Sequence, residues 1–351
     1  MKQSSVFRLL IGLGIVFNVA GCSASAHRFS LPPTSRTDIV THHTLSNSSY
    51  TTPSPLETEG WGVGFVRQEH LNISPFDRPQ TEEFSIPMNT AFSPYLIIGQ
   101  QYSKSTTVLI TVLLDYKQVP FTLDGIHGLL HKLTLPPKSD VYLKMEMVID
   151  ELGAHDLIII AFAEPDFHPL EEEQRLTRLN PSLVGRRAVV IVGNDRAGYR
   201  KLGTDMLGNP IPEATYDALR VFFAHLPKRR LGAPLADSQL FFETIPPGAF
   251  FAFQIVAKNE HLESAEYAIV IFFDFRQVKI SNDGVILTKL GPNEESTYKV
   301  EMPIPNDKEV HELQAVYVFD PYKSILREEV TAPFVFGSVR AGIQALKKNH
   351  K

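Results

Sequence analysis

The chain of 351 residues contains a single cysteine and a single tryptophan. One cysteine leaves no pair for an intrachain disulfide, which excludes a small disulfide-built fold and a cysteine-rich zinc module. Basic residues are not in excess either, because the formal net charge is −5 at pH 7, and this argues against a nucleic-acid-binding protein. Glycine-rich phosphate-binding motifs and a Gly-x-Ser-x-Gly motif are also missing. The sequence therefore gives no sign of phosphate binding or of serine-hydrolase chemistry.

The composition is that of a globular protein. Hydrophobic residues make up 43% of the chain, and it contains 25 prolines and 23 phenylalanines. This excludes a wholly disordered chain, a collagen-like repeat and a multi-span membrane protein. The length suits two or three domains, and the proline and phenylalanine content favours β-structure with many turns.

The first 21 residues have the layout of a secretory signal. Lys2 and Arg8 give a charged start, and residues 9–20 form an apolar run interrupted only by glycine and Asn18. Such a run is too short for a transmembrane helix but typical of a signal peptide.

The signal ends in Val19-Ala20-Gly21-Cys22. In this order of charge, apolar run, small residues and cysteine, the segment closely resembles the lipobox of bacterial lipoprotein precursors. The resemblance covers the first 22 residues. It implies that Cys22 becomes the new N-terminus and carries a thioether-linked diacylglycerol, usually with an amide-linked acyl chain such as palmitate. Ser23, in place of Asp, implies the outer membrane where the host has two. The alternative is an ordinary secretory signal followed by an unrelated cysteine.

Residues 22–58 are rich in Ser, Thr and Pro and show no apolar periodicity. Segments of this kind bury too little surface to offset their ordering entropy. We predict a disordered tether with a reach of roughly 30–36 Å.

The rest of the chain repeats itself. Residues 84–92 resemble 242–250 at an offset of 158, and 113–119 resemble 272–278 at an offset of 159. The match continues to the ends of the copies, where we align 188–193 with 332–337. Strand-like alternation in 108–116 and 267–275 falls in register, so both copies are predicted to bury the same face.

About seven short strands in each copy predict a mostly β fold with two tandem antiparallel β-sandwich domains of immunoglobulin-like type. Tyr216, Leu219, Phe222 and Phe223 have helical spacing, which predicts a short helix in the linker. The predicted segments are a signal peptide (1–21), a lipidated cysteine and tether (22–58), a first sandwich (59–193), a linker (194–241), a second sandwich (242–338) and a basic tail (339–351).

The outward faces of the central strands are apolar. They carry Leu109, Leu113, Ala268, Val270 and Phe272. Since an open patch of this size would be sticky, we expect the helix, the other sandwich or a partner to cover it.

Several polar residues recur in both copies. Asp115 and Lys117 match Asp274 and Arg276. Each set could be a repeated binding spot, but we favour an outward ion pair, or an aspartate that caps a turn leading to Gln118 or Gln277. His155 and His311 also match. They are either a pH-sensitive or ligand-contacting pair, or polar residues at the start of an apolar strand, which we favour.

His127 and His131 lie four residues apart, but a glycine and an apolar run favour loop and strand over a metal-binding helix. We predict no metal site and no cofactor.

Charged stretches break the symmetry of the repeat. After Pro165 the first copy has an insertion. The candidate interaction residues in this region and in the linker are Glu171, Glu172, Glu173, Arg186, Arg187, Lys228, Arg229 and Arg230. Solvated loops are the simpler interpretation, but loops added to one copy are where we expect a partner to bind.

These observations predict a lipid-anchored envelope or cell-surface protein with a non-catalytic binding or scaffolding role and a protein or glycan partner. The alternatives are a carbohydrate- or solute-binding lipoprotein, a subunit of an envelope machine and a lipoprotein enzyme.

Overall fold

A computed structural model gives the fold. It describes residues 27–28, 40–45, 50–53, 60–73, 83–177, 183–193, 206–207, 209–210, 219–225, 239–259, 263–280, 284–307, 309–322 and 334–346. Cys22, the signal peptide and Lys228, Arg229 and Arg230 lie outside these ranges. Within them, no helix is long and apolar enough to cross a membrane.

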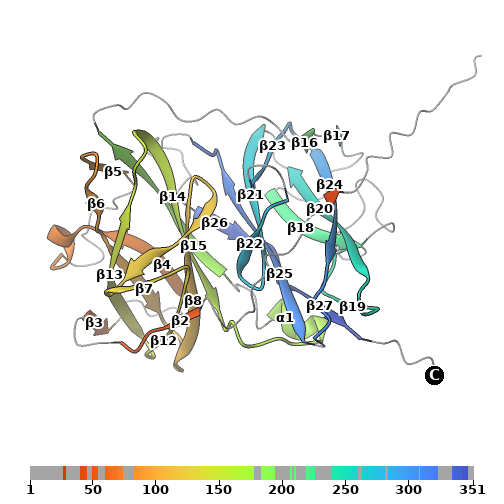
Figure 1. Ribbon diagram of the computed structural model, residues 1–351, viewed down its shortest axis with the longest axis horizontal. Coiled ribbons are helices and arrows are strands. Elements are labelled where there is room, and N and C mark those ends of the chain that lie inside the picture. The colour runs from red at the N-terminus through yellow and green to blue at the C-terminus, as the bar shows by residue number, and fades with distance from the viewer. Residues whose placement is uncertain are drawn as a thin grey trace, which may run out of the picture.

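Four sheet layers follow one another across the molecule (Figure 1). The first sandwich contains β2 Val40–His42, β3 Tyr50–Pro53, β4 Trp61–Val66, β5 Glu83–Ile86, β6 Ala91–Phe92, β7 Tyr95–Gln100, β8 Thr106–Leu114, β9 Lys117–Val119, β10 Phe121–Leu123, β11 Ile126–Gly128, β12 Leu130–Leu135, β13 Ser139–Val148, β14 Gly153–Ala163 and β15 Leu183–Val192, with the 3-10 helix η1 Gln68–His70 and the helix α1 Glu172–Thr177.

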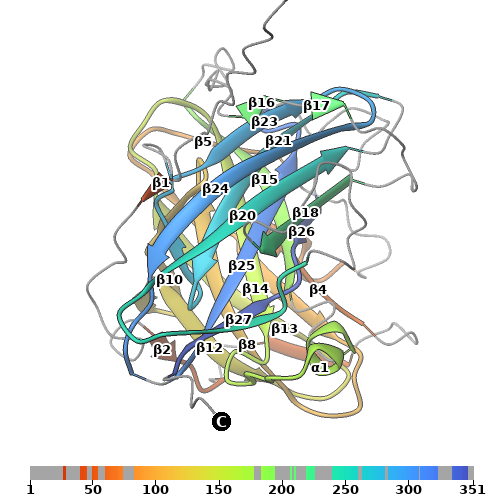
Figure 2. The same ribbon diagram turned by 90° about the vertical axis from the view of Figure 1, so that its right-hand side faces the viewer.

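The second sandwich repeats this arrangement, and its outer sheet faces the viewer in Figure 2. It contains β1 His27–Arg28, β16 Met206–Leu207, β17 Asn209–Pro210, β18 Leu219–His225, β19 Phe242–Ile245, β20 Phe250–Asn259, β21 Ala265–Phe273, β22 Arg276–Val278, β23 Ile286–Leu290, β24 Glu294–Pro303, β25 Val310–Phe319, β26 Phe334–Gly337 and β27 Ala341–Ala345. The predicted fold class of two β-sandwiches is confirmed.

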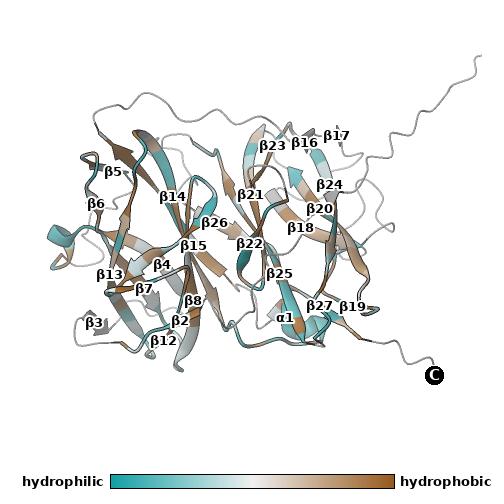
Figure 3. Ribbon diagram, viewed as in Figure 1, coloured by the Kyte–Doolittle hydropathy of each residue, from teal (hydrophilic) through white to brown (hydrophobic). Residues whose placement is uncertain are grey.

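The two inner layers are joined at one edge and packed face to face. At the edge, β26 pairs with β25 on one side and with β15 on the other. The inner strands β8 and β15 are coloured hydrophobic in Figure 3, whereas α1 is hydrophilic. Three apolar cores result: one inside each sandwich and a third between the inner layers.

The third core covers the outward apolar faces of the central strands. Leu109 and Leu113 of β8 pack in one cluster with Ala268, Val270 and Phe272 of β21. The other sandwich therefore covers the patch, as one of the three expected alternatives. In β8 the alternate residues Val108, Ile110 and Val112 face the core of their own sandwich, as the period of two predicted.

The predicted linker helix is wrong. Residues 219–225 form β18, which pairs antiparallel with β20. Val221 and Phe223 face the core of the second sandwich, and Phe222 and Ala224 pack on its other face against Val256. A short apolar run buried on both faces has no period that separates a strand from a helix.

The repeat begins earlier than the sequence showed. β18 pairs with β20 as β4 pairs with β7, so the second sandwich starts well before residue 242. In the same way β16 corresponds to β2 and β17 to β3. The short strands β16 and β17 pair at sheet edges through backbone hydrogen bonds. Such bonds do not depend on the side chains, so the sequence shows no clear pattern for them.

Part of the predicted tether is also structured. β1 pairs with β24 of the second sandwich, β2 with β12 and β3 with β13 of the first. Composition favoured disorder, but an open sheet edge stabilises an added strand through main-chain bonds whatever its side chains.

The C-terminal alignment of the copies needs a correction of nine residues. Leu157 pairs with Ala188 in the first sandwich, and Leu313 pairs with Ala341 in the second. Ala188 therefore corresponds to Ala341 and not to Ala332. The second sandwich runs to β27, so the segment predicted as a basic tail, 339–351, contains the whole of its last strand.

Candidate functional site at the junction of the sandwiches

A two-residue turn of the same shape stands at the junction in each copy. Asp115 and Tyr116 join β8 to β9, and Asp274 and Phe275 join β21 to β22. All four residues have positive φ, between 48° and 65°. Two consecutive positive φ values are typical of a type I′ hairpin, which accepts Asp readily but an aromatic residue only under constraint. The turn aims the buried rings of Tyr116 and Phe275 into the third core.

Each turn aspartate binds a histidine on the neighbouring strand. Asp115 Oδ2 lies 2.7 Å from His155 Nδ1, and Asp274 Oδ2 lies 2.7 Å from His311 Nδ1. The second oxygen of Asp115 accepts the backbone N–H of Asp156 at 3.0 Å, and that of Asp274 accepts Glu312 N–H at 3.0 Å.

The repeated polar residues are thus brought together in part. The histidines and aspartates form one structural pair per copy, whereas Lys117 lies on the surface and Arg276 is half-buried. Asp115 and Asp274 lie in the turns that lead to Gln118 and Gln277, and each binds a histidine across the sheet. Arg276 is also within the electrostatic influence of Asp274.

The pKa of both histidines is raised above the ordinary 6.5. For His155 the main cause is its hydrogen bond to Asp115, which outweighs burial. For His311 burial is the largest single effect and favours the neutral ring, but the hydrogen bond and charge of Asp274, with those of Asp307, outweigh it. Both rings therefore keep their charge to a higher pH than a free histidine.

This gives a pH dependence of stability. We expect the free energy of unfolding to fall as pH rises from about 6.5 through the raised pKa values, because the folded state then loses protons that it holds more tightly than the unfolded chain. Urea denaturation at a series of pH values measures it. The double variant His155→Gln/His311→Gln should be less stable but flat over this range.

His131 serves as the control, because burial lowers its pKa to about 4 and its contribution is lost only on the acid side. His131→Gln should leave the alkaline decline unchanged. A decline that persists in the double glutamine variant would contradict the assignment.

A buried ion pair lies beside each histidine. Arg187 donates to Asp156 Oδ1 from Nε at 2.9 Å and from Nη2 at 2.7 Å, and both side chains are fully buried. At the corresponding position in the second copy, Arg340 Nε lies 3.6 Å from Glu312 Oε2. Tyr116 adds a 2.6 Å hydrogen bond from its hydroxyl to Asp156 Oδ2.

The two arginines also cross the junction in opposite directions. Arg187 of the first sandwich donates to the carbonyl of Asp320 in the second, at 3.1 Å. Arg340 of the second donates to the carbonyls of Glu164 at 3.2 Å and Phe167 at 2.7 Å in the first.

Two glutamines make the junction symmetric. Gln118 N–H donates to Gln277 Oε1 at 2.6 Å, and Gln277 N–H donates to Gln118 Oε1 at 2.8 Å. Each residue contacts the counterpart of itself, which is the signature of an isologous, two-fold interface. The two sandwiches therefore meet as the halves of a symmetric dimer would.

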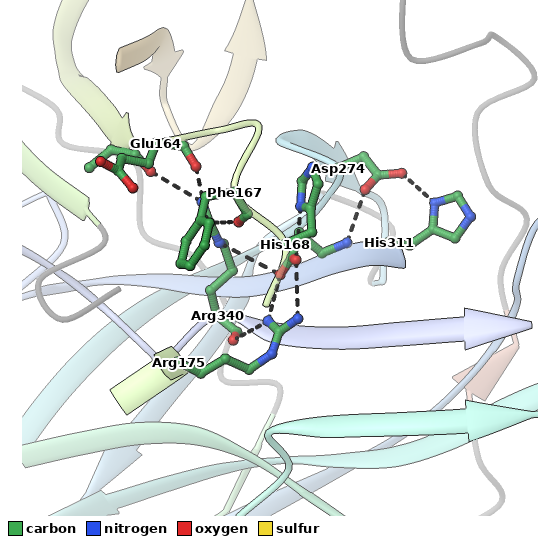
Figure 4. A network of polar contacts seen from close by, with 9 residues as sticks. Glu164, Phe167, His168, Arg175, Asp274, His311 and Arg340 are labelled. Atoms are coloured by element: carbon green, nitrogen blue, oxygen red, sulfur yellow. Dashed lines mark hydrogen bonds and ion pairs between the residues drawn. The ribbon is translucent and has the colours of Figure 1, made fainter. Parts of the chain in front are cut away.

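The segment between β14 and β15 breaks this symmetry (Figure 4). With Ala188 aligned to Ala341, it is only three residues longer than its counterpart, because Pro165 lies 23 residues before Ala188 and Pro321 lies 20 before Ala341, so the predicted long insertion is wrong. Arg175 of α1 donates to both oxygens of Glu312, at 2.8 and 3.2 Å, and is itself fully buried. His168 Nδ1 lies 3.0 Å from Glu312 Oε1. At Gly342 a Cβ would collide with the Arg175 guanidinium, so glycine makes room for it. This segment acts as a strap from the first sandwich to the second.

The candidate interaction residues separate accordingly. Glu171, Glu172 and Glu173 are exposed at the start of α1, and Arg186 is half-buried. Arg187 is fully buried, so its proposed part in partner binding is wrong, because its charge is used inside the fold. Sequence reasoning missed Arg175 and Arg340, and it assigned no ion pair to Asp156 and Glu312, which follow the matched histidines. The dipeptide Arg-Ala, present at 187–188 and 340–341, is the signal that could have found Arg340.

A second histidine cluster lies away from the junction. Buried His131 directs Nε2 at the carbonyls of Phe121 (3.2 Å) and Gly128 (3.1 Å), while its Nδ1 lies 2.6 Å from His43 Nε2. With Nε2 protonated, Nδ1 accepts the hydrogen bond from His43. His127 is exposed, and its Nδ1 lies 3.4 Å from Thr122 Oγ1. Among the described residues, no group of three or more His, Cys, Asp or Glu side chains is placed to hold a metal ion.

A groove of about 170 Å³ opens at the junction, between the sandwiches. It is lined by Val40, His42, Leu109, Lys132, Pro165 and Asp166 of the first sandwich and by Asp274 and Phe275 of the second. Lys132 Nζ and Asp166 Oδ2 form an ion pair of 2.5 Å at its rim.

Comparison with known proteins assigns this chain to no family. No family model matches the sequence, and no curated protein matches it. Among solved structures, the chain is similar to the CARDB domain of the PF1109 protein from Pyrococcus furiosus, with a TM-score of 0.24, 10% identity, and coverage of 44% of this chain and 100% of that one.

Two further structures are similar over more of the chain. The E. coli chaperone DraB has a TM-score of 0.23 and 10% identity, with coverage of 82% of this chain and 97% of that one. The calcium binding domain CBD12 of CALX1.1 has a TM-score of 0.20 and 11% identity, with coverage of 75% and 97%. Likenesses at this level support no inference about function.

Proposed function

We propose that this chain is a lipid-anchored protein of the bacterial envelope or cell surface, held by Cys22, with a non-catalytic binding or scaffolding role. The observation that carries the proposal is the use of the repeated polar residues. The Asp–His pairs, the glutamines and the buried arginines bind one another and the backbone at the junction. That is a structural use, which joins two sandwiches into one body and leaves loops and the groove to face a partner.

The position of β1 supports a short anchor. His27 pairs with Val300 of the second sandwich and lies five residues after Cys22. At up to about 3.6 Å per residue, five residues span at most roughly 18 Å. The second sandwich would then be held within this distance of the membrane surface. A free tether over residues 22–58 would let it move further away.

Fatty-acid labelling in the native host tests the anchor. We expect the chain to incorporate an alkyne analogue of palmitate, because two or three acyl chains on Cys22 give stable anchoring. Cys22→Ala should abolish the label, whereas the neighbouring change Ser25→Ala should leave it unchanged. An unlabelled wild-type chain whose mature N-terminus is not Cys22 would contradict the proposal.

The same cells test the binding role. After mild cross-linking, the anchored chain should copurify with one discrete protein or polysaccharide, and the Cys22→Ala chain should lose it. Copurification with itself alone would contradict a scaffolding role in the envelope.

A further inference from the structure

The groove at the junction has a counterpart related by the two-fold symmetry of the repeat, and the counterpart is filled. The two turns that border them correspond closely. Glu164 N–H donates to the carbonyl of Thr107, and Asp320 N–H to that of Glu266, at 2.8 and 3.0 Å. Glu164 and Asp320 both have positive φ, of 44° and 47°, and a proline follows each. Asp166 therefore occupies the place that Tyr322 occupies in the other half.

Tyr322 fills its side of the junction. Its side chain is only 7% exposed, and its ring meets that of Tyr116 edge to face, with centroids 5.1 Å apart. Its backbone N–H donates to Asp156 Oδ2 at 2.8 Å. Edge-to-face contact is a favoured arrangement of aromatic rings.

Asp166 leaves the equivalent space open. Its side chain is 72% exposed and points to Lys132 at the rim. The ring that borders the groove is Phe275, the counterpart of Tyr116. It is 4% exposed and its other contacts include Phe162 at 5.1 Å, and Leu109 and Val40 complete an apolar floor. The groove is thus the place of a missing aromatic side chain.

We propose that the groove binds a tyrosine side chain of a partner protein, seated against Phe275 as Tyr322 is seated against Tyr116. The proposal rests on the binding role proposed above and assigns it a site. The size fits, because an engineered apolar cavity of about 150 Å³ in another protein admits benzene, and this groove has about 170 Å³.

The polar rim favours a phenol over an anion. Asp166 and Asp274 both line the groove, together with Lys132 and His42. Two carboxylates repel a phosphate or carboxylate ligand but accept a hydrogen bond from a phenolic hydroxyl. Asp166 accepts from Lys132 through Oδ2, and its side chain is 72% exposed. A carboxylate has about four lone-pair sites, so Asp166 can accept a bond from a phenolic hydroxyl as well.

The test uses p-cresol, the tyrosine side chain as a free molecule, with the full mature chain. We expect saturation-transfer NMR to show binding, weakened at least tenfold in Asp166→Tyr, where the new ring takes the place that Tyr322 takes in the other half. Asp166→Asn, which breaks the ion pair without filling the space, should still bind. Thermal unfolding should show that Asp166→Tyr is folded and at least as stable as wild type.

Two further probes test whether the ligand needs a hydroxyl donor and whether it belongs to a peptide. 4-Methylanisole, whose ring is similar but has no donor, should bind more weakly than p-cresol. N-acetyl-tyrosine amide should compete with p-cresol, as expected for a side chain on a peptide backbone. No p-cresol binding to wild type, or equal binding to Asp166→Tyr, overturns the site. Failure of the acetylated amide to compete overturns the protein partner in favour of a small phenol. Neither result affects the labelling at Cys22, so the two proposals fail separately.

Discussion

Replacing Arg187 by Ala should lower the free energy of unfolding by about 3–5 kcal/mol, the cost typical of leaving one member of a buried ion pair without its partner. Asp156 is fully buried, and Arg187 supplies its opposite charge through two hydrogen bonds of 2.9 and 2.7 Å. The change also removes the bond from Arg187 to the carbonyl of Asp320 in the other sandwich. Urea denaturation followed by tryptophan fluorescence measures the loss.

Two controls separate charge from packing. Lys117→Ala, at an exposed position of the same sandwich, should change stability by no more than about 0.5 kcal/mol. Asp156→Asn combined with Arg187→Ala should recover part of the loss. The amide oxygen still accepts from Tyr116, and position 156 no longer carries an unpaired buried charge. A single-variant loss below about 1 kcal/mol, or a double variant no more stable than the single one, is incompatible with this role.

The second large effect concerns the association of the sandwiches. With a protease site inserted between residues 194 and 205, the cut chain should elute as one species, because the third core and the reciprocal glutamine and arginine bonds hold the halves together. Phe162→Ala should weaken this association by about 3–5 kcal/mol, which is roughly two to three orders of magnitude in the dissociation constant. Phe162 is fully buried, and its ring meets Phe272 and Phe275 of the other sandwich at 5.4 and 5.1 Å.

Phe253→Ala is the matched control. Phe253 is equally buried but belongs to the core of the second sandwich, against Phe223 and Phe251. It should lower the stability of that sandwich and leave the affinity of the folded halves unchanged. Size-exclusion chromatography over a dilution series compares the three chains. Halves of the wild-type chain that separate at once after cutting would refute an interface of this strength.

The sequence by itself determined the duplication, the β-sandwich fold and the inward face of the central strands. These follow from local patterns, since alternation in 108–116 and 267–275 depends only on which residues avoid water. It also determined that Leu109, Leu113 and Phe272 need a cover, although it could not choose among three covers. The lipid anchor is predicted from the motif that ends at Cys22.

Tertiary structure decided what the polar residues do. Asp115 has a lysine two residues away in the chain, yet binds His155 on the next strand. Arg187, a candidate interaction residue by its sequence, is buried against Asp156, and Arg175 binds Glu312, which lies 137 residues further along the chain. No local pattern encodes these pairs, because each depends on how a strand or a strap from one sandwich meets the other.

The errors at the edges have the same origin. The sequence predicts a helix where β18 lies, because an apolar run buried on both faces has no period that marks a strand. It predicts a tether where β1, β2 and β3 lie, because backbone bonds and not side chains hold these strands. The groove shows the limit most clearly. Asp166 and Tyr322 are unremarkable as residues, and only the two-fold packing of the sandwiches shows that one fills the space that the other leaves open.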